Sequence, residues 1–314
     1  MKLGVTFGHS LDPSEIVAGA VRCEKSGFDA IFVSESTGID SLSVLGAIAA
    51  KTNQITLGSG VVNVYSRSAT QLAMAAVTLG ELSKWRFVLG IGASSKGVVS
   101  GWHGLEFSNQ LQKVSESIDS MRKKIEQTGS KLHAEYTAKI PILLAAVGQK
   151  MISLARSKAD GVIFFLRPLD LMKKDDLDAF DGSFQVCTSV VTCVSEQPEA
   201  AESRVRKTVA FYIAFGEAYR RLLVKQELLS DAVADSIRSE WMRGKIEQSA
   251  TLVPRELLEQ VAIFGKPADC KKKIEEYSSV HSLSHLLLQF NPGSNDLAES
   301  LSLLGMLSEK ATMK

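Results

Sequence analysis

The sequence lacks an excess of charge and a long apolar run. Its 36 Lys and Arg residues nearly balance 35 Asp and Glu residues, giving a net charge of +1, so nothing predicts a nucleic-acid or membrane partner. The longest apolar run, from Ile140 to Val147, is far shorter than the ~18 residues that suggest a membrane span. The opening stretch, MKLGVTFGHSLD, turns polar too early for a signal peptide. We therefore expect a soluble, cytoplasmic protein.

Several sequence motifs are also missing. The four cysteines form no CxxC pair, and no histidines and carboxylates share a ligand spacing, so we predict no metal site. These cysteines fit buried free thiols in a reducing compartment. Neither GxxxxGK[ST] nor a complete GxGxxG nor GxSxG occurs, which leaves P-loop, Rossmann and serine-hydrolase functions unsupported.

What the sequence does contain is a regular alternation of apolar and amphipathic stretches. Near-continuous apolar strands are typical of a parallel sheet covered by helices on its outer face, and eight strand–helix units predict an α/β fold, a (β/α)8 TIM barrel. The expected strands are Leu3–Phe7, Ala30–Ser34, Ile55–Val62, Phe87–Gly92, Ile140–Ala146, Gly161–Phe165, Phe184–Cys193 and Leu286–Phe290. The expected helices are Pro13–Lys25, Ser41–Lys51, Ala69–Ser83, Gln110–Gln127, Lys150–Lys158 and Pro198–Phe211.

One segment breaks this alternation. Residues 195–283, between the seventh and eighth expected strands, are too long for a single helix and have a mostly helical pattern. We interpret them as a helical insertion within a single TIM-barrel domain that spans residues 1–314. The length of the chain allows this, since TIM barrels commonly run to ~250 residues or more with insertions.

The ends of the expected strands carry the candidate functional residues, because TIM-barrel active sites lie at that face. Glu35 is the carboxylate that a strand would deliver directly to the mouth, although a salt bridge at the barrel rim is an equally ordinary role. Two stretches of small residues, GIGASSK (90–96) and AVGQK (146–150), follow strands. The second opens a helix, whose N-terminal N–H groups attract anions, although small residues can also simply allow close packing.

The third expected strand raises a question of its own. Gly58 and Gly60 interrupt the stretch ITLGSGVVNVYSR (55–67). Glycine weakens a strand interior and often marks a bulge or a close approach of another group. Polar residues from Asn63 onward then follow the strand.

The stretch LGSGVVNVYSRSATQLAMAAVTLGELSKWRFVLGIGASS (57–95) resembles the luciferase-like flavin and deazaflavin enzymes. It is most similar to the methylenetetrahydromethanopterin reductase branch, which uses coenzyme F420. The stretches IPILLAAVGQKMISLARSKADGVI (140–163), VAFYIAFG (209–216) and FGKPADCKKKIEEY (264–277) also resemble that branch, so the resemblance covers essentially the whole chain.

This resemblance implies a set of site residues. In the family the third strand carries a bulge, often with a non-proline cis peptide, that supports the flavin ring from behind. Here it would fall at Gly60–Val61, and Asn63 would contact the ring. The resemblance places the cofactor phosphate at Gly148 and Gln149. Further cofactor candidates are Ser94, Ser95, Lys96 and Val147, and the catalytic candidates are Glu35 and Asn63.

The sequence departs from the family pattern at three positions. The methanogenic reductases carry a glutamate in the first strand, and the matching position here is Thr6, which cannot supply a carboxylate's charge or proton. Many relatives read Asp-His after the second strand, where this chain reads Glu35-Ser36. The proline usual after Asn63 is Val64.

Together these observations predict an oxidoreductase that transfers a hydride between coenzyme F420 and a small organic substrate. Reduction of 5,10-methylenetetrahydromethanopterin, or a related reaction, is one candidate. An FMN-dependent monooxygenase is the first alternative, and a flavin-binding barrel without turnover is the second. The resemblance also implies a homodimer formed by outer helices, and an insertion that closes over the mouth and influences substrate choice.

Overall fold

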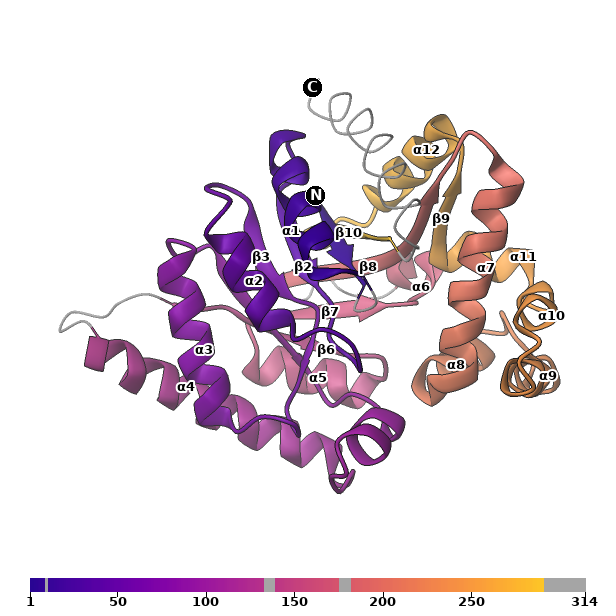
Figure 1. Ribbon diagram of the computed structural model, residues 1–314. Helices are drawn as coiled ribbons and strands as arrows, with labels where there is room; N and C mark the ends of the chain where they lie inside the picture. The colour runs from indigo at the N-terminus through magenta and orange to yellow at the C-terminus, as the bar shows by residue number, and fades with distance from the viewer. Residues whose placement is uncertain (9–10, 133–138, 175–181, 291–314) are drawn as a thin grey trace.

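A computed structural model describes residues 1–8, 11–132, 139–174 and 182–290 (Figure 1). Parallel strands form a closed barrel in it, because β10 pairs with both β1 and β8. In order, its strands are β1 (Lys2–Phe7), β2 (Ala30–Val33), β3 (Thr56–Ser59), β5 (Phe87–Gly92), β6 (Ile142–Ala145), β7 (Gly161–Phe165), β8 (Gln185–Val194) and β10 (His285–Phe290). The predicted (β/α)8 barrel is therefore confirmed.

Helices cover the outside of the barrel between successive strands (Figure 1). Asp12, Asp40 and Ser68 accept hydrogen bonds from backbone N–H groups at the starts of α1, α2 and α3, which fixes where each helix begins. The helices up to β8 are α1 (Pro13–Lys25), α2 (Ser41–Ala49), α3 (Ala69–Leu82), the π-helix η1 (Gly97–Trp102), α4 (Gln110–Leu132), α5 (Gln149–Lys158) and α6 (Leu169–Lys174). Neither η1 nor α6 was predicted, because each has only six residues.

The third expected strand, Ile55–Val62, is in fact divided into β3 and β4 (Val62–Asn63). Leu57 pairs with Phe87, whereas Val62 pairs with Ile91. The β3–β4 side thus uses one residue more than β5 over the same distance, which defines a bulge. The peptide bond between Gly60 and Val61, inside this bulge, is cis.

The barrel interior explains the glycines of that strand. A Cβ atom on Gly58 would lie 2.4 Å from Cε1 of Phe32, so the ring of Phe32 occupies the space that a side chain would need. Val61 packs on the same interior cluster from the bulge. That cluster consists of Ala30, Phe32, Val88, Leu143, Ile163, Cys187 and Leu287.

The segment between β8 and β10 contains six helices and one strand among the described residues. They are α7 (Pro198–Phe215), α8 (Glu217–Lys225), α9 (Asp231–Met242), α10 (Ile246–Thr251), α11 (Arg255–Val261), β9 (Ala262–Gly265) and α12 (Pro267–Tyr277). Helices α7 to α11 gather on one side of the barrel (Figure 1) and share a separate apolar cluster with β8 and β9. The four-residue strand β9 was not predicted; it extends the sheet beyond β8. That residues 1–314 form a single domain stays a prediction.

No helix in the described part of the chain is long and apolar enough to span a membrane.

Candidate active site

The strand ends bring three of the predicted site segments to one edge of the barrel. Asn63 of β4 lies in register with Gly92 of β5, and Ile91 of β5 lies in register with Leu144 of β6. The stretch that follows β5 and the stretch that follows β6 therefore begin next to Asn63. This adjacency is what a cofactor that touches all three segments requires.

The bulge forms an apolar floor at this edge. The side chain of Val61 packs on the interior cluster, and a Cβ atom on Gly92 would lie 3.0 Å from Cγ2 of Val61 and 3.3 Å from Cβ of Ala145. Glycine at position 92 therefore lets Val61 pack tightly between strands. The cis peptide lies at Gly60–Val61, the position that the resemblance implied, while support of a cofactor by Gly60 and Val61 stays a prediction.

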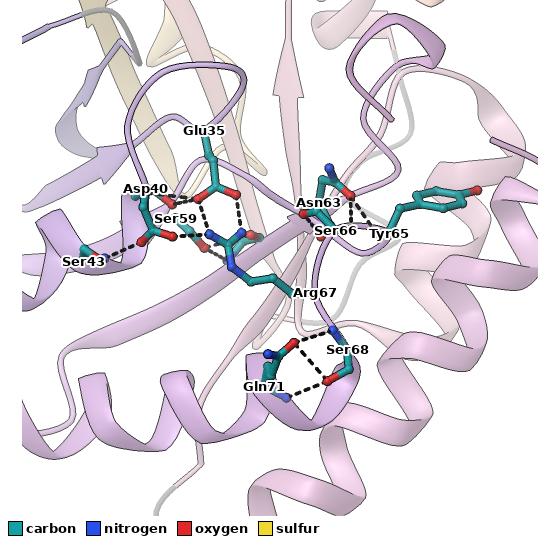
Figure 2. Close-up of polar contacts among 12 residues, drawn as sticks. Glu35, Asp40, Ser43, Ser59, Asn63, Tyr65, Ser66, Arg67, Ser68 and Gln71 are labelled. Atoms are coloured by element: carbon teal, nitrogen blue, oxygen red, sulfur yellow. Dashed lines mark hydrogen bonds and ion pairs between the residues drawn. The ribbon is translucent and has the colours of Figure 1, made fainter. Parts of the chain in front are cut away.

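Asn63 is buried, and the oxygen of its side-chain amide already accepts two hydrogen bonds. Its Oδ1 accepts hydrogen bonds from the backbone N–H groups of Tyr65 (2.7 Å) and Ser66 (3.0 Å). The amide nitrogen points away from this turn (Figure 2). The turn thus fixes the side chain and directs an N–H donor elsewhere, which fits the predicted contact with a cofactor ring.

Glu35 lies in a polar network at the rim of the barrel (Figure 2). Its Oε1 bonds Nη1 of Arg67, and its Oε2 accepts from Nη2 of Arg67 (3.0 Å) and from both the backbone N–H (3.1 Å) and hydroxyl (3.0 Å) of Ser41. Arg67 also bonds Asp40. Glu35 therefore ties the segment after β2 to the segment after β4, and its contacts favour the salt-bridge role; acid–base catalysis by Glu35 stays a prediction.

The charges of this network reinforce one another. Burial alone would lower the pKa of Arg67, but the hydrogen bonds and charges of Glu35 and Asp40 raise that pKa above its usual value. Burial alone would raise the pKa of Asp40, but hydrogen bonds from Ser43 and Arg67 lower it. Arg67 and Asp40 are therefore held in their charged forms at neutral pH.

The two small-residue stretches have different surroundings. Ser94 adopts a positive φ of 60°, and Ser95 Oγ accepts a 3.4 Å hydrogen bond from the N–H of Val98 at the start of η1. Both Ser94 and Lys96 are exposed. These residues border the predicted cofactor site, and binding by Ser94, Ser95 and Lys96 stays a prediction.

The second stretch forms an open helix N-terminus. Gly148 is the N-cap of α5 and supplies no side-chain cap. Among the described residues, and apart from its chain neighbours and its own helix backbone, no heavy atom lies within 4 Å of the position that a Cβ on Gly148 would take. Gly148 and Gln149 are exposed, with Val147 partly buried beside them. Backbone N–H groups at such a terminus bind phosphate, so the chain's own residues fit the predicted phosphate contact.

Sequence reasoning missed a chain of hydrogen bonds on the other side of the barrel interior. Ser189 Oγ of β8 lies 3.1 Å from Gln289 Oε1 of β10 and 3.3 Å from Thr6 Oγ1 of β1. Gln289 Nε2 donates to the hydroxyl of Tyr212 in α7 at 3.4 Å. The available signal was the presence of Ser189 and Gln289 among the apolar residues of β8 and β10; the contact with Tyr212, distant in sequence, had no local signal.

Comparison with known proteins adds to this geometry. The family model of the luciferase-like monooxygenases matches residues 2–281. A Mycobacterium tuberculosis protein named as a coenzyme F420-dependent oxidoreductase is 28% identical, over 87% of this chain and 91% of that protein. The 5,10-methylenetetrahydromethanopterin reductase of Archaeoglobus fulgidus is 27% identical, over 97% of this chain and 98% of the reductase.

Among solved structures, the coenzyme F420-dependent tetrahydromethanopterin reductase from Methanopyrus kandleri has the same fold. It superimposes with a TM-score of 0.81 over 99% of both chains, at 20% identity. The resemblance to the luciferase-like enzymes and their methylenetetrahydromethanopterin reductase branch, and with it the prediction of an oxidoreductase, is confirmed. A family model that matches nearly the whole barrel leaves one conclusion: this chain belongs to the luciferase-like monooxygenase family.

Proposed function

We propose that this protein transfers a hydride between coenzyme F420 and a small organic substrate. The observation that carries the proposal is the placement of the Gly60–Val61 bulge and the open N-terminus of α5 at the same barrel edge. An apolar floor suits a planar ring and an uncapped helix N-terminus suits a phosphate. The name of the Mycobacterium relative supports F420 as the cofactor.

Each predicted residue has a role in this proposal. Val61 would support the ring from the barrel side, and the amide nitrogen of Asn63 would bond its edge. The N–H groups near Gly148 and Gln149 would bind the phosphate. When bound, the deazaflavin supplies or accepts the hydride, while the protein positions the ring and excludes water.

FMN is the alternative cofactor, because the matching family model describes monooxygenases. The two cofactors share a tricyclic ring and a phosphate, so the apolar floor and the α5 terminus suit both. Oxygen activation by reduced FMN would then replace hydride transfer to a substrate.

Parallel titrations of the purified protein with F420 and with FMN, followed by fluorescence quenching, test the proposal. We expect micromolar binding of F420 and at least about tenfold weaker binding of FMN, a difference of about 1.4 kcal/mol. A reversed preference would favour the monooxygenase and make oxygen consumption the next assay. Binding of neither cofactor below millimolar concentration would refute the assignment. Tight F420 binding without hydride exchange to any substrate would instead indicate a barrel without turnover.

Reduction of 5,10-methylenetetrahydromethanopterin is the finer proposal that the reductase relatives support. Thr6 bears on it directly. Thr6 is 2% exposed and lies within hydrogen-bonding distance of Ser189, so this position supplies a hydroxyl in place of the carboxylate implied by the resemblance. A substrate screen with the F420-loaded protein should therefore include pterins, alcohols and sugars.

We also propose a homodimer formed through α3 and α4, which pack side by side. Its support is a set of exposed apolar side chains on these helices. They are Met74 (54%), Leu82 (53%), Leu111 (38%) and Leu132 (57%). Sedimentation equilibrium should show a dimer that Met74→Glu dissociates. Met242→Glu on α9, where the methionine is 64% exposed, should leave the dimer intact; a wild-type monomer would contradict the proposal.

A cytoplasmic location is proposed on the state of the cysteines. All four are buried and none forms a disulfide, and burial raises the pKa of Cys23 and Cys187 to about 12. Such thiols are unreactive and suit a reducing compartment. Cell fractionation tests this location.

A further inference from the structure

Three uncharged polar side chains, Thr6, Ser189 and Gln289, lie on the strand-end side of the barrel interior, and Tyr212 of α7 joins them through its contact with Gln289. Successive residues of a strand face opposite sides. Ser189 and Gln289 therefore face the same way as the interior residues Cys187 and Leu287, two positions earlier in each strand. Thr6 lies in register with Gln289. These positions project into the interior one layer nearer the mouth than the apolar cluster.

The hydrogen bonds of this layer have a direction. Ser189 donates to Oε1 of Gln289, which leaves Nε2 of the same amide to donate to the hydroxyl oxygen of Tyr212. An amide nitrogen is only a donor, so Tyr212 must be the acceptor in that contact. The proton of the Tyr212 hydroxyl is therefore directed away from Gln289 and can be donated to a ligand.

Tyr212 is also the least buried side chain of this group. Thr6, Ser189 and Gln289 are 2%, 6% and 4% exposed, whereas Tyr212 is only partly buried. Its ring is held edge-on by Phe165, with centroids 4.6 Å apart, and by Phe211, 5.3 Å apart.

The chemistry of the four groups limits what they can bind. Thr, Ser and Gln do not titrate, and burial raises the pKa of Tyr212, so its hydroxyl keeps its proton at neutral pH. A charged group placed against these side chains would lose its hydration without gaining an opposite charge. An uncharged oxygen acceptor meets a well-oriented donor instead.

We propose that the Tyr212 hydroxyl donates a hydrogen bond to the reacting oxygen of an uncharged carbonyl or alcohol substrate. In this assignment Gln289, Ser189 and Thr6 are positioning residues that orient the Tyr212 proton. The inference rests on the proposed hydride transfer and names the substrate class for the same site.

With a ketone, the reduced deazaflavin would supply the hydride that forms the new C–H bond at the carbonyl carbon. The electron pair of the C=O π bond would move to the oxygen, and that oxygen would take the proton of Tyr212. The N–H of Gln289 would hold the phenolate, which would regain a proton from water. The products would be the alcohol and the oxidised deazaflavin.

The test uses cyclohexanone as an uncharged carbonyl probe and the full-length protein without cofactor. Infrared difference spectra report the C=O stretching frequency of the bound ketone, which a hydrogen-bond donor lowers. We expect a lowered frequency with the wild type. Tyr212→Phe should lose this shift and bind cyclohexanone about fivefold more weakly, since a hydrogen bond contributes on the order of 1 kcal/mol. Gln289→Leu should reduce the shift without abolishing it, because the donor remains but is no longer oriented.

Tyr277→Phe is the matched control. Tyr277 is fully buried in α12, outside this chain of hydrogen bonds, and its hydroxyl has no hydrogen-bond partner among the residues that the structure describes, so the same atom is removed away from the proposed ligand. An unshifted or unbound ketone in the wild type, or the same shift in Tyr212→Phe, would overturn the inference. A parallel F420 titration keeps the two proposals apart: failure to bind F420 refutes the proposed cofactor, whereas the ketone shift alone decides the role of Tyr212.

Discussion

Replacing Gly90 by alanine is expected to destabilise the barrel by about 3 kcal/mol or more. A Cβ on Gly90 would lie 1.9 Å from the carbonyl oxygen of Ser59 and 3.1 Å from its carbonyl carbon. Both are backbone atoms of the neighbouring strand, so no side-chain rotation can relieve the overlap. The strands must separate, and that breaks the contacts of Ser59 Oγ with the backbone O (2.8 Å) and N–H (2.9 Å) of Gly90.

Urea unfolding followed by circular dichroism measures this effect. Gly101→Ala is the matched control, because a Cβ on Gly101 in η1 would meet no described heavy atom within 4 Å outside its chain neighbours and its own helix backbone. The free energy of unfolding of that variant should lie within about 0.5 kcal/mol of the wild-type value. If Gly90→Ala unfolded at the same urea concentration as Gly101→Ala, β3 and β5 would not approach as closely as described.

The contrast between Gly58 and Phe32 shows what the sequence could and could not predict. Glycines within an apolar strand indicate that something approaches closely, and this was recognised from the sequence alone. The approaching group is the ring of Phe32, which lies on the adjacent strand. Naming it requires the strand register, and no local pattern contains that register. Sequence reasoning therefore located the bulge but not the packing that makes glycine necessary.

The barrel was predictable for a related reason. Strands covered on both faces are apolar at nearly every position, which makes them visible without any knowledge of their partners. The strand β9, in contrast, was not predicted. Its four residues directly follow α11 and are too few to give a recognisable strand pattern in the sequence.

The candidate site divides in the same way. Asn63 ends β4, and Gly148 lies in the short loop after β6. Their place at the mouth of the barrel was therefore predictable from the fold. The partner of Glu35 could not be chosen from the sequence, because Arg67 reaches it from another loop. Likewise, the contact between Tyr212 and Gln289 joins the insertion to the last strand, and only the closed barrel brings them together.

The largest functional effect is expected from Gly148→Asp. Aspartate is a preferred N-cap residue, and its carboxylate would accept hydrogen bonds from the first N–H groups of α5. The space at this position is open, so the variant should fold at least as stably as the wild type. The same carboxylate would occupy and charge the terminus that the proposed phosphate needs. Two negative charges ~4 Å apart near a protein surface repel by about 4 kcal/mol at an effective dielectric constant of 20, so we expect F420 affinity to fall by at least tenfold.

Gly148→Asn separates charge from shape. Asparagine caps a helix about as well as aspartate and has nearly the same size, but it carries no charge. We therefore expect the asparagine variant to bind F420 several-fold more tightly than the aspartate variant, with the difference shrinking as salt screens the repulsion. Fluorescence titrations at low and high ionic strength measure both effects. Equal affinities for the two variants would mean that the phosphate is bound away from α5, with Ser94, Ser95 and Lys96 as the remaining candidates. Because both variants keep the helix capped, a loss of affinity confined to aspartate reports on the charge at this terminus and not on the integrity of the barrel.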